Sequence, residues 1–195
     1  MEQLFEKGSV LFKKYKHIDH VEMELRLGKM YRGGFDTNVG RVNYEIIKQS
    51  LESYNEWEDV LESDTSVYYS NNIRMAFDNA TDEHIHTMEK TKVESVDVKF
   101  TESPYDVRFA VSVEKPIEFE GDADMVRVKK RKSFIRKNVR IDITEVAGEN
   151  EDIDDEEEGR YEIELEIIDV RKVLSDTQLY NTLYKFVCIM DTLKG

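Results

Sequence analysis

The chain has 195 residues, 39% of them hydrophobic and 36% charged, with a formal net charge of -14 and one cysteine. This length suits one well-cored domain, and a single cysteine excludes an internal disulfide. The acidic balance argues against extensive binding of duplex or single-stranded nucleic acid, and neither a run of about eighteen apolar residues nor a signal-peptide pattern occurs. We therefore expect one soluble, intracellular domain over 1–195 with no membrane partner.

The hydrophobic pattern predicts the secondary structure in chain order. A helix is expected over 4–16, broken or bent near Gly8, then a strand over 18–28 and, after a turn at Gly33 and Gly34, an amphipathic helix over 43–57. Strands follow over 67–78 (one or two, around Asn71 and Asn72), 84–100 (with a bend near Glu94), 106–114, 125–135 and 139–146. A last strand over 161–167 precedes a helix over 169–193 whose wide apolar face must dock.

Eight carboxylates are concentrated in residues 149–158. This segment lacks the spaced ligands and central glycine of a calcium-binding EF-hand loop. A dense run of like charges is typical of a solvated segment. We expect an acidic mobile loop there.

The strand over 161–167 alternates between two kinds of side chain. Glu162, Glu164 and Glu166 share one face, and apolar residues share the other, because successive side chains of a strand point to opposite faces. The strand over 18–28 repeats this pattern with Glu22 and Glu24. The strands between them carry bases instead, namely Arg74, Lys90, Lys92, Arg108, Arg127, Lys129 and Arg131. Acids and bases are therefore segregated by strand.

Seven or eight strands with one apolar and one charged face, together with at least three helices that need cover, predict the fold. The economical arrangement is an α+β protein in which a closed antiparallel eight-stranded β-barrel has its charged faces inward and is wrapped by helices outside. A sandwich or open sheet with charged faces in water is the alternative, but a solvated surface tends to mix charge signs within a face. An outer-membrane barrel is disfavoured by the helices and by the lack of aromatic girdles.

The inward charges predict a chemistry. Glu22, Glu24 and Glu166 offer hard oxygen ligands of the kind that suits Mg²⁺ or Mn²⁺. The arginines and lysines suit phosphate, the arginines through their planar fork. Together they describe a site for a metal-bound polyphosphate.

Seven short motifs occur in an order that resembles the triphosphate tunnel metalloenzymes. They are Val21-Glu22-Met23-Glu24, Ile73-Arg74, Lys90-Thr91-Lys92, Arg108 to Glu114, Arg127 to Phe134, Ile141-Asp142-Ile143-Thr144 and Glu162 to Glu166. They cover most of the chain and are most similar to the RNA 5'-triphosphatases of fungal, protozoan and large-DNA-virus mRNA capping. A lone Glu-x-Glu carries little information, whereas seven motifs in family order are specific.

The resemblance implies a metal-dependent hydrolase that removes the γ-phosphate from 5'-triphosphate RNA, with a metal-dependent NTPase side activity. It implies that Glu22, Glu24 and Glu166 hold Mg²⁺ or Mn²⁺. It further implies that Arg74, Lys129 and Arg131 contact the phosphates with help from Lys90. It implies that Arg127, Asp142 and Thr144 organise the tunnel walls and that Glu162 and Glu164 brace the basic side chains. Either Glu114 or Glu164 would position the attacking water. Whether Lys90 or Lys92 fills the family's lysine position stays open, because both face the same way.

Other assignments remain open from the sequence. A tripolyphosphatase or other small-molecule triphosphatase of the same fold is one alternative, although such relatives usually open with Glu-x-Glu-x-Lys and Arg26 occupies the last position here. A non-catalytic polyphosphate-binding module is another. No nucleotidyl-transfer Lys-x-Asp-Gly motif occurs, so we expect a stand-alone enzyme or a fragment, with guanylyltransferase and methyltransferase domains outside this chain. If the chain is viral, it would act in the host cytoplasm or virion.

Two further residues lie in apolar patterns. Cys188 falls in the C-terminal helical pattern and is expected to be an inert core thiol. Trp57, at the end of the second predicted helix, is expected to pack rather than to stack on a base. Neither residue is assigned to the candidate site.

Overall fold

The computed structural model describes residues 1–147 and 159–194. Its strands are β1 (Val21–Tyr31), β2 (Gly34–Asp36), β3 (Asp59–Ser70), β4 (Ile73–Asp78), β5 (His84–Val98), β6 (Asp106–Pro116), β7 (Met125–Arg136), β8 (Val139–Ala147) and β9 (Arg160–Ile167). Its helices are α1 (Glu2–Tyr15), α2 (Gly40–Ser53) and α3 (Asp176–Asp191), with short 3-10 helices η1 (Val170–Lys172) and η2 (Thr192–Lys194). The acidic segment predicted to be mobile lies outside the described residues.

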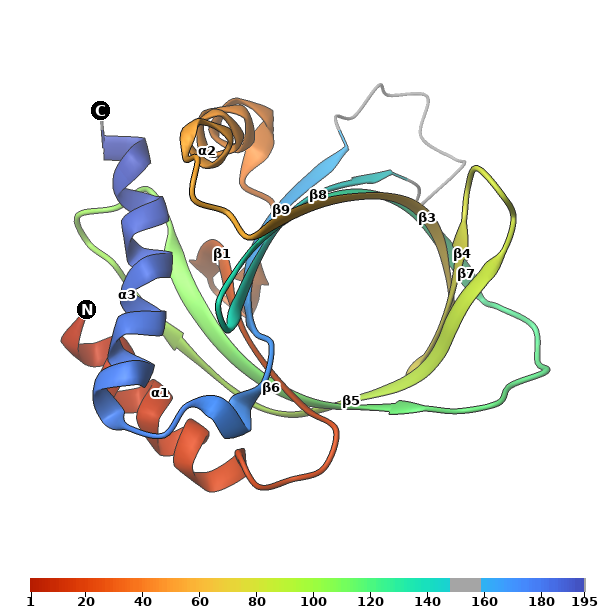
Figure 1. Ribbon diagram of the computed structural model, residues 1–195, viewed down its shortest axis with the longest axis horizontal. Helices are drawn as coiled ribbons and strands as arrows, with labels where there is room; N and C mark the ends of the chain where they lie inside the picture. The colour runs from red at the N-terminus through yellow and green to blue at the C-terminus, as the bar shows by residue number, and fades with distance from the viewer. Residues whose placement is uncertain (148–158, 195) are drawn as a thin grey trace.

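The strands form one sheet that closes on itself. Their order is β2-β1-β6-β5-β4-β3-β7-β8-β9, and β1 pairs with β9 as well as with β6. All these pairings are antiparallel, and the ring of strands is visible end-on in Figure 1. The predicted eight-stranded closed barrel is confirmed. The additional strand β2 lies outside the ring as a hairpin on β1.

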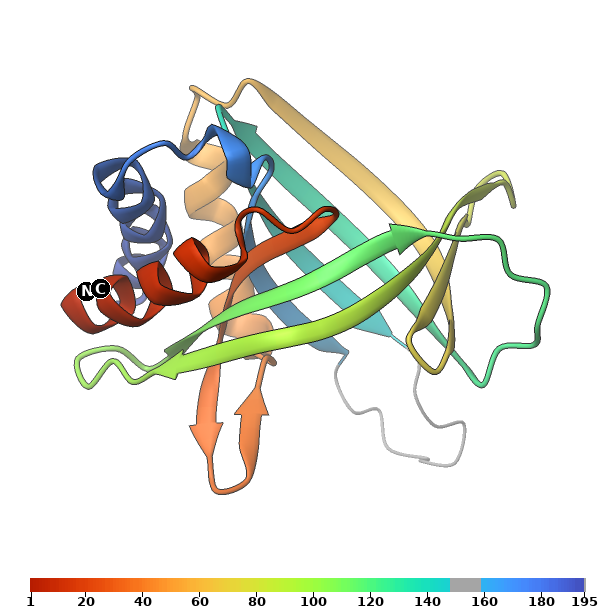
Figure 2. The ribbon, with the colours of Figure 1, turned by 90° about the horizontal axis from the view of Figure 1, so that it is seen from below.

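The outward faces of β1, β6, β8 and β9 form the core with the helices. Met23, Leu25, Phe109, Ile143 and Leu165 are all fully buried there. All three α-helices gather on one side of the barrel, as Figures 1 and 2 show. The prediction that helices wrap the barrel therefore holds for one side only. On the other side the outward residues Tyr68 and Val126 are exposed, so fewer apolar contacts are made there.

Three helix predictions were wrong in detail. Helix α2 begins at Gly40, three residues before its prediction, and ends at Ser53, four residues before the predicted end. Helix α1 is continuous through Gly8, which is buried, and a Cβ there would lie 3.4 Å from Leu183 Cδ1 of α3. Gly8 thus lies in the contact between α1 and α3 and does not interrupt the helix. The C-terminal helix begins late, because the Ser175 hydroxyl accepts a hydrogen bond from the Gln178 N–H and fixes the start of α3. The residues before Ser175 form η1 and an extended link.

Strand predictions failed where apolar alternation is missing. Strand β3 begins at Asp59, eight residues before the prediction, and is paired along its length with β7. Its first half was not predicted because polar and acidic residues there leave no apolar alternation. The short strand β2 was not predicted. It approaches β1 so closely that a Cβ on Gly28 would lie 2.2 Å from the Asp36 carbonyl oxygen. The bend predicted in β5 is a register shift between Lys92 and Glu94.

Cys188 is exposed on α3, so its prediction as a core thiol was wrong. The packing prediction for Trp57 is confirmed, since its ring lies 5.4 Å from that of Phe134. No helix in residues 1–147 and 159–194 is long and apolar enough to cross a membrane. The single-domain organisation over 1–195 stays a prediction.

Candidate active site

Carboxylates from β1 and β9 form one wall of the barrel interior. Glu24 is paired directly with Glu166 across the two strands, and Arg26 is paired with Glu164. Glu22 lies two residues before Glu24 and therefore on the same inward face. Like charges directly opposite one another in a sheet repel. This wall requires positive charge nearby.

Lys90 of β5 supplies part of that charge. Its Nζ contacts Glu22 Oε2, lies 2.8 Å from Glu114 Oε1 and lies 3.7 Å from Glu24 Oε1. The Ser112 hydroxyl donates a second hydrogen bond to Glu22 Oε2 at 2.7 Å. The structure thus brings three of the predicted site carboxylates together around Lys90.

Arg26 is the second positive group of the acidic wall. Its Nη2 lies 2.7 Å from Glu24 Oε1, and its Nε lies 3.0 Å from Glu164 Oε1. Glu164 is nearly buried and also lies 4.0 Å from Arg131. Arg26 was not predicted to have a role in the site, although the alternation that places Glu22 and Glu24 on the inward face places Arg26 there too.

The surroundings split the carboxylates into two kinds. Burial and the charge of Glu164 raise the pKa of Glu24 to about 7, and burial together with Glu22 and Asp142 raises the pKa of Glu166 to about 7 against the opposing effect of Arg140. Burial would also raise the pKa of Glu164, but Arg26, Arg131 and other cations lower it to about 2. Glu164 is fully ionised near neutral pH, whereas Glu24 and Glu166 are partly protonated there, because the effect of burial outweighs their ion pairs with Arg26 and Arg140.

The donor set of Glu22, Glu24 and Glu166 fits a hard divalent cation. Burial, together with neighbouring carboxylates, raises the pKa of Glu24 and of Glu166, so a bound cation would favour their ionised forms. In the described part of the chain no three acidic, histidine or cysteine side chains are grouped closely enough to hold a metal ion. Instead Lys90 binds Glu22, and the Arg140 guanidinium binds Glu166.

Cations from β4 and β7 surround one inward-facing ring. Arg74 and Arg127 lie 5.6 and 5.4 Å from the centre of the Tyr69 ring, and Lys129 Nζ lies 6.0 Å from it. Tyr69 is paired with Arg74 across the β3–β4 hairpin, so it shares the inward face. Tyr69 was not predicted from the sequence as a site residue. The sequence left open whether 67–78 holds one or two strands; a hairpin at Asn71 and Asn72 would have placed Tyr69 opposite Arg74.

Arg131 connects the basic strand β7 to β8. Its Nε donates to Thr144 Oγ1 at 3.2 Å, and its Nη1 lies 3.3 Å from Asp142 Oδ2. Asp142 is buried and also accepts from the Ser133 hydroxyl at 2.6 Å and from Arg140 Nε at 3.1 Å. Asp142 and Thr144 thus hold Arg131 in a fixed orientation. Arg140, which the sequence analysis also missed, shares their face by the same alternation.

Three predicted residues lie at the edges of this arrangement. Arg108 makes two hydrogen bonds to Asp97, at 2.7 and 2.9 Å, and stacks 4.6 Å from the Phe35 ring. Lys92 is exposed, whereas Lys90 is nearly buried among carboxylates. Glu162 accepts a hydrogen bond from the Thr37 hydroxyl at 2.9 Å. Phosphate binding by Arg108 and Lys92 stays a prediction.

Comparison with known proteins assigns the chain to a family. The family model described as mRNA capping enzyme, beta chain, matches residues 37–185, well over half of the sequence. The chain belongs to the mRNA triphosphatase family. The mRNA-capping enzyme subunit beta of Cryptococcus neoformans is 29% identical to this mRNA triphosphatase family member over 115 residues, which cover 58% of this chain and 29% of that protein. The chain thus spans less than a third of that relative.

Solved structures show the same fold as this mRNA triphosphatase family member. The S. pombe Pct1 RNA triphosphatase matches with a TM-score of 0.75 at 14% identity, covering 86% of this chain and 81% of that one. The same protein in complex with the Spt5 CTD matches with a TM-score of 0.70. The mimivirus capping enzyme triphosphatase matches with a TM-score of 0.68 at 17% identity, with 98% of each chain covered. The resemblance found in the sequence motifs is therefore confirmed for the family and the fold.

The pKa shifts predict how the stability of the metal-free protein depends on pH. Between about pH 4.5 and 7 the folded protein keeps protons on Glu24 and Glu166 that the unfolded chain has lost. Rising pH therefore favours unfolding in this window, by up to about 3 kcal/mol for each carboxyl. We expect Glu166→Gln to remove the part of this pH dependence that comes from Glu166. The free energy of unfolding of the variant, measured with urea and a chelator, should therefore fall less from pH 5 to 7.5 than that of wild type. Parallel profiles for the two proteins would contradict the assignment.

Proposed function

We propose that this mRNA triphosphatase family member removes the γ-phosphate from 5'-triphosphate RNA, leaving 5'-diphosphate RNA, as in the first step of mRNA capping. The observation that carries the proposal is the division of the barrel interior into a wall of carboxylates and a wall of cations. A triphosphate end with a bound metal has the complementary distribution of charge. Family membership supports the same reaction.

Glu22, Glu24 and Glu166 would hold the metal, which we propose to be Mg²⁺ or Mn²⁺. Enzymes of this family are generally metal-dependent, and the raised pKa values of two of these carboxylates favour a site for added positive charge. A bound metal would neutralise charge on the phosphate oxygens. Lys90 compensates the same carboxylates, so it and the metal compete for their charge.

The cations of β4 and β7 bind and orient the phosphates. Arg131 is preoriented by Asp142 and Thr144, and Arg74 and Lys129 are held around Tyr69. Phosphoryl transfer requires little covalent chemistry, so its rate depends on alignment and on neutralising the charge of the γ-phosphate. Side chains fixed before substrate arrives provide both.

Glu114 is the better candidate to orient the attacking water. Glu164 is nearly buried between Arg26 and Arg131, and its pKa of about 2 makes it a poor proton acceptor. Glu114 is more exposed and contacts only the Lys90 ammonium among the described ion pairs. We assign the water to Glu114 and the bracing of the basic groups to Glu164.

Tyr69 should matter through its ring rather than its hydroxyl group. Each cation–π contact contributes about 0.5–2 kcal/mol, and three cations share this ring. We expect Tyr69→Leu to lower kcat/KM for triphosphate RNA by roughly ten- to thirtyfold and Tyr69→Phe to stay near wild type. Tyr68→Leu, on the outward face of the same strand, is the matched control. Equal losses at Tyr68 and Tyr69 would exclude a positioning role.

The proposed enzyme recognises only the charged end of its substrate. An acidic protein repels the RNA body, so we expect inorganic tripolyphosphate to compete with triphosphate RNA and RNA with a 5'-monophosphate to bind weakly. Slower NTP hydrolysis with the same metals is a proposed side activity. Tight binding of RNA without a 5'-triphosphate would contradict end recognition.

Phosphate release from triphosphate RNA, tripolyphosphate and ATP, each with Mg²⁺, Mn²⁺ or a chelator, tests the proposed function. The highest kcat/KM on RNA and no release with the chelator are expected. A preference for tripolyphosphate would favour the small-molecule triphosphatase. Binding of tripolyphosphate without any release would favour a non-catalytic module.

The proposed reaction implies partners outside this chain. Its product, diphosphate RNA, is the acceptor for guanylyl transfer, so we propose that guanylyltransferase and methyltransferase domains act next on the same RNA end. The relative from Cryptococcus neoformans is a capping enzyme subunit, and Pct1 has been solved with the Spt5 CTD. We propose that this chain acts inside the cell, where nascent triphosphate ends are available.

A further inference from the structure

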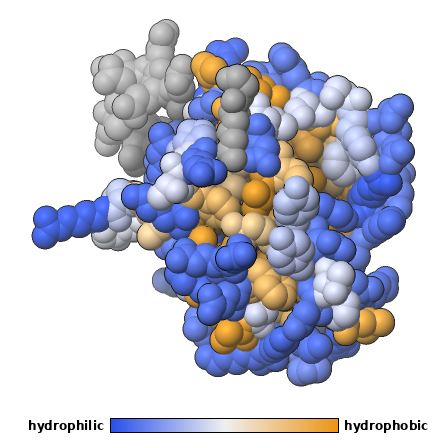
Figure 3. Space-filling view, turned by 90° about the vertical axis from the view of Figure 1, so that its left-hand side faces the viewer, coloured by the Kyte–Doolittle hydropathy of each residue, from blue (hydrophilic) through white to orange (hydrophobic). Residues whose placement is uncertain are grey.

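A groove lies outside the barrel, between α2 and α3. It encloses about 690 Å³ and is lined by Ile47, Ser50, Leu51, Ser53, Tyr54, Trp57, Arg136, Lys137, Val139, Ile141, Tyr184, Lys185, Cys188, Ile189 and Thr192. Figure 3 shows apolar surface gathered in the middle of the helix-bearing face, with hydrophilic residues around it. The groove is separate from the charged interior, because the barrel wall of β7 and β8 lies between them.

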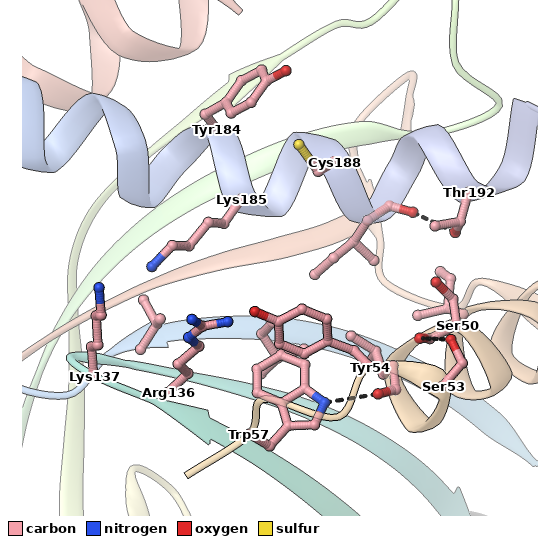
Figure 4. Close-up of a pocket in the computed structure, with 15 residues that line it drawn as sticks. Ser50, Ser53, Tyr54, Trp57, Arg136, Lys137, Tyr184, Lys185, Cys188 and Thr192 are labelled. Carbon is pink, nitrogen blue, oxygen red and sulfur yellow. Dashed lines mark hydrogen bonds between the residues drawn. The ribbon is translucent and has the colours of Figure 1, made fainter.

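Aromatic side chains give the groove a fixed apolar floor. The Trp57 indole N–H donates to the Leu51 carbonyl oxygen at 2.7 Å, and the ring packs 5.1 Å from that of Tyr54. On the opposite side, Tyr184 and Cys188 project from one face of α3 (Figure 4). The lining of α3 extends from residue 184 to 192, about 12 Å along the helix axis. This length suits two turns of a helix or a short extended segment.

The groove carries three cations toward one end. Lys185 and Lys137 point toward the same end in Figure 4, with Arg136 beside them. Partial burial, and then the charges of Lys137 and Arg136, lower the pKa of Lys185. Arg136 is paired with Glu56 at 2.6 Å, but within residues 1–147 and 159–194 no carboxylate lies within 4.0 Å of the Lys137 or Lys185 ammonium.

We propose that this groove binds an apolar peptide segment of a partner protein with acidic side chains at one end. The floor of Trp57 and Tyr54 accepts the apolar residues, as in recognition of an amphipathic helix by a groove. Lys137 and Lys185 accept the carboxylates, which would relieve their mutual repulsion. The chain has a net charge of -14, so most of its surface repels an acidic peptide. The cationic end of the groove therefore attracts the acidic end of the peptide and fixes the direction in which the peptide binds.

A selection with phage-displayed random 12-residue peptides tests the proposal. Enriched sequences should combine Leu or aromatic residues with Asp or Glu toward one end. Synthetic copies should shift the fluorescence of Trp57, which is the single tryptophan of the chain and therefore reports the groove directly. Binding should weaken as salt is raised.

Paired variants distinguish the groove from other surfaces. Lys137→Glu combined with Lys185→Glu should weaken peptide binding by about tenfold or more, whereas Lys99→Glu, at an exposed lysine outside the groove, should not. Both proteins should keep full phosphate release from triphosphate RNA, since neither change touches the barrel interior. Enriched peptides without acidic residues, or equal binding to the double variant, would overturn the proposal. Displacement of the peptide by ATP would overturn the proposal in favour of a nucleotide site. Self-association of the chain that excludes the peptide, measured by sedimentation, would overturn it in favour of an interface between two copies.

Discussion

Glu24→Gln is expected to lower kcat for phosphate release from triphosphate RNA by roughly a hundred- to thousandfold, because several kcal/mol of charge stabilisation is lost. Glu24 is the most buried carboxylate of the acidic wall, and it lies directly opposite Glu166. Glutamine keeps the shape of the side chain and removes its charge. The fold should persist, because Arg26 and Lys90 retain Glu164, Glu22 and Glu114 as partners.

The matched control is Glu62→Gln, at an exposed outward position of β3. Its kcat should equal that of wild type. The rate of phosphate release at saturating triphosphate RNA, measured with Mg²⁺ and with Mn²⁺, gives kcat for each variant. Circular dichroism checks that each variant is folded. Full activity of Glu24→Gln in both metals would remove Glu24 from the metal site.

Arg26→Met is expected to destabilise the protein by about 3–5 kcal/mol, since it leaves Glu24 and Glu164 buried without their shared partner. The loss should be smaller at pH 5 than at pH 8, because Glu164 without Arg26 takes up a proton more readily. Urea unfolding at the two pH values measures this difference.

A double variant separates the loss of the ion pair from the loss of packing. Arg26→Met with Glu164→Gln should regain part of the stability, because the second change removes the uncompensated charge. Arg32→Met, at an exposed arginine in the turn after β1, should change stability by less than about 0.5 kcal/mol. No recovery in the double variant would mean that Arg26 stabilises the barrel through contacts other than Glu164.

The closed barrel could be predicted because most of its strands alternate clearly. Over residues 21–27 of β1 and throughout β9 every second residue is charged and the residues between them are apolar or aromatic, so a single register satisfies both the interior and the helix-bearing side. The first half of β3 has no such pattern. Its ladder with β7 decides its structure, and that pairing depends on residues far away in the sequence. Which side of the barrel the helices leave uncovered could not be predicted either, because it too depends on contacts between residues far apart in the sequence.

The identity of the inward residues could be predicted, but not their partners. Alternation placed Lys90 and Lys92 on one face, whereas the position of each along the barrel decides that only Lys90 reaches Glu22 and Glu114. Likewise Arg26 meets Glu164 only because β1 closes the ring against β9. Contacts across a closed barrel depend on which strands meet and in which register, and no local pattern encodes that register.

Alanine substitution of four successive residues of β7 distinguishes an active site inside the barrel from one on its outer surface. Lys129 and Arg131 face inward toward Tyr69 and Asp142, whereas Lys130 and Lys132 face outward, where Lys132 pairs with Glu52. Phosphate release from triphosphate RNA should therefore fall by roughly a hundredfold or more for Lys129→Ala and Arg131→Ala and stay near wild type for Lys130→Ala and Lys132→Ala. Equal activities for all four variants, or losses at the outward lysines, would contradict an active site inside the barrel.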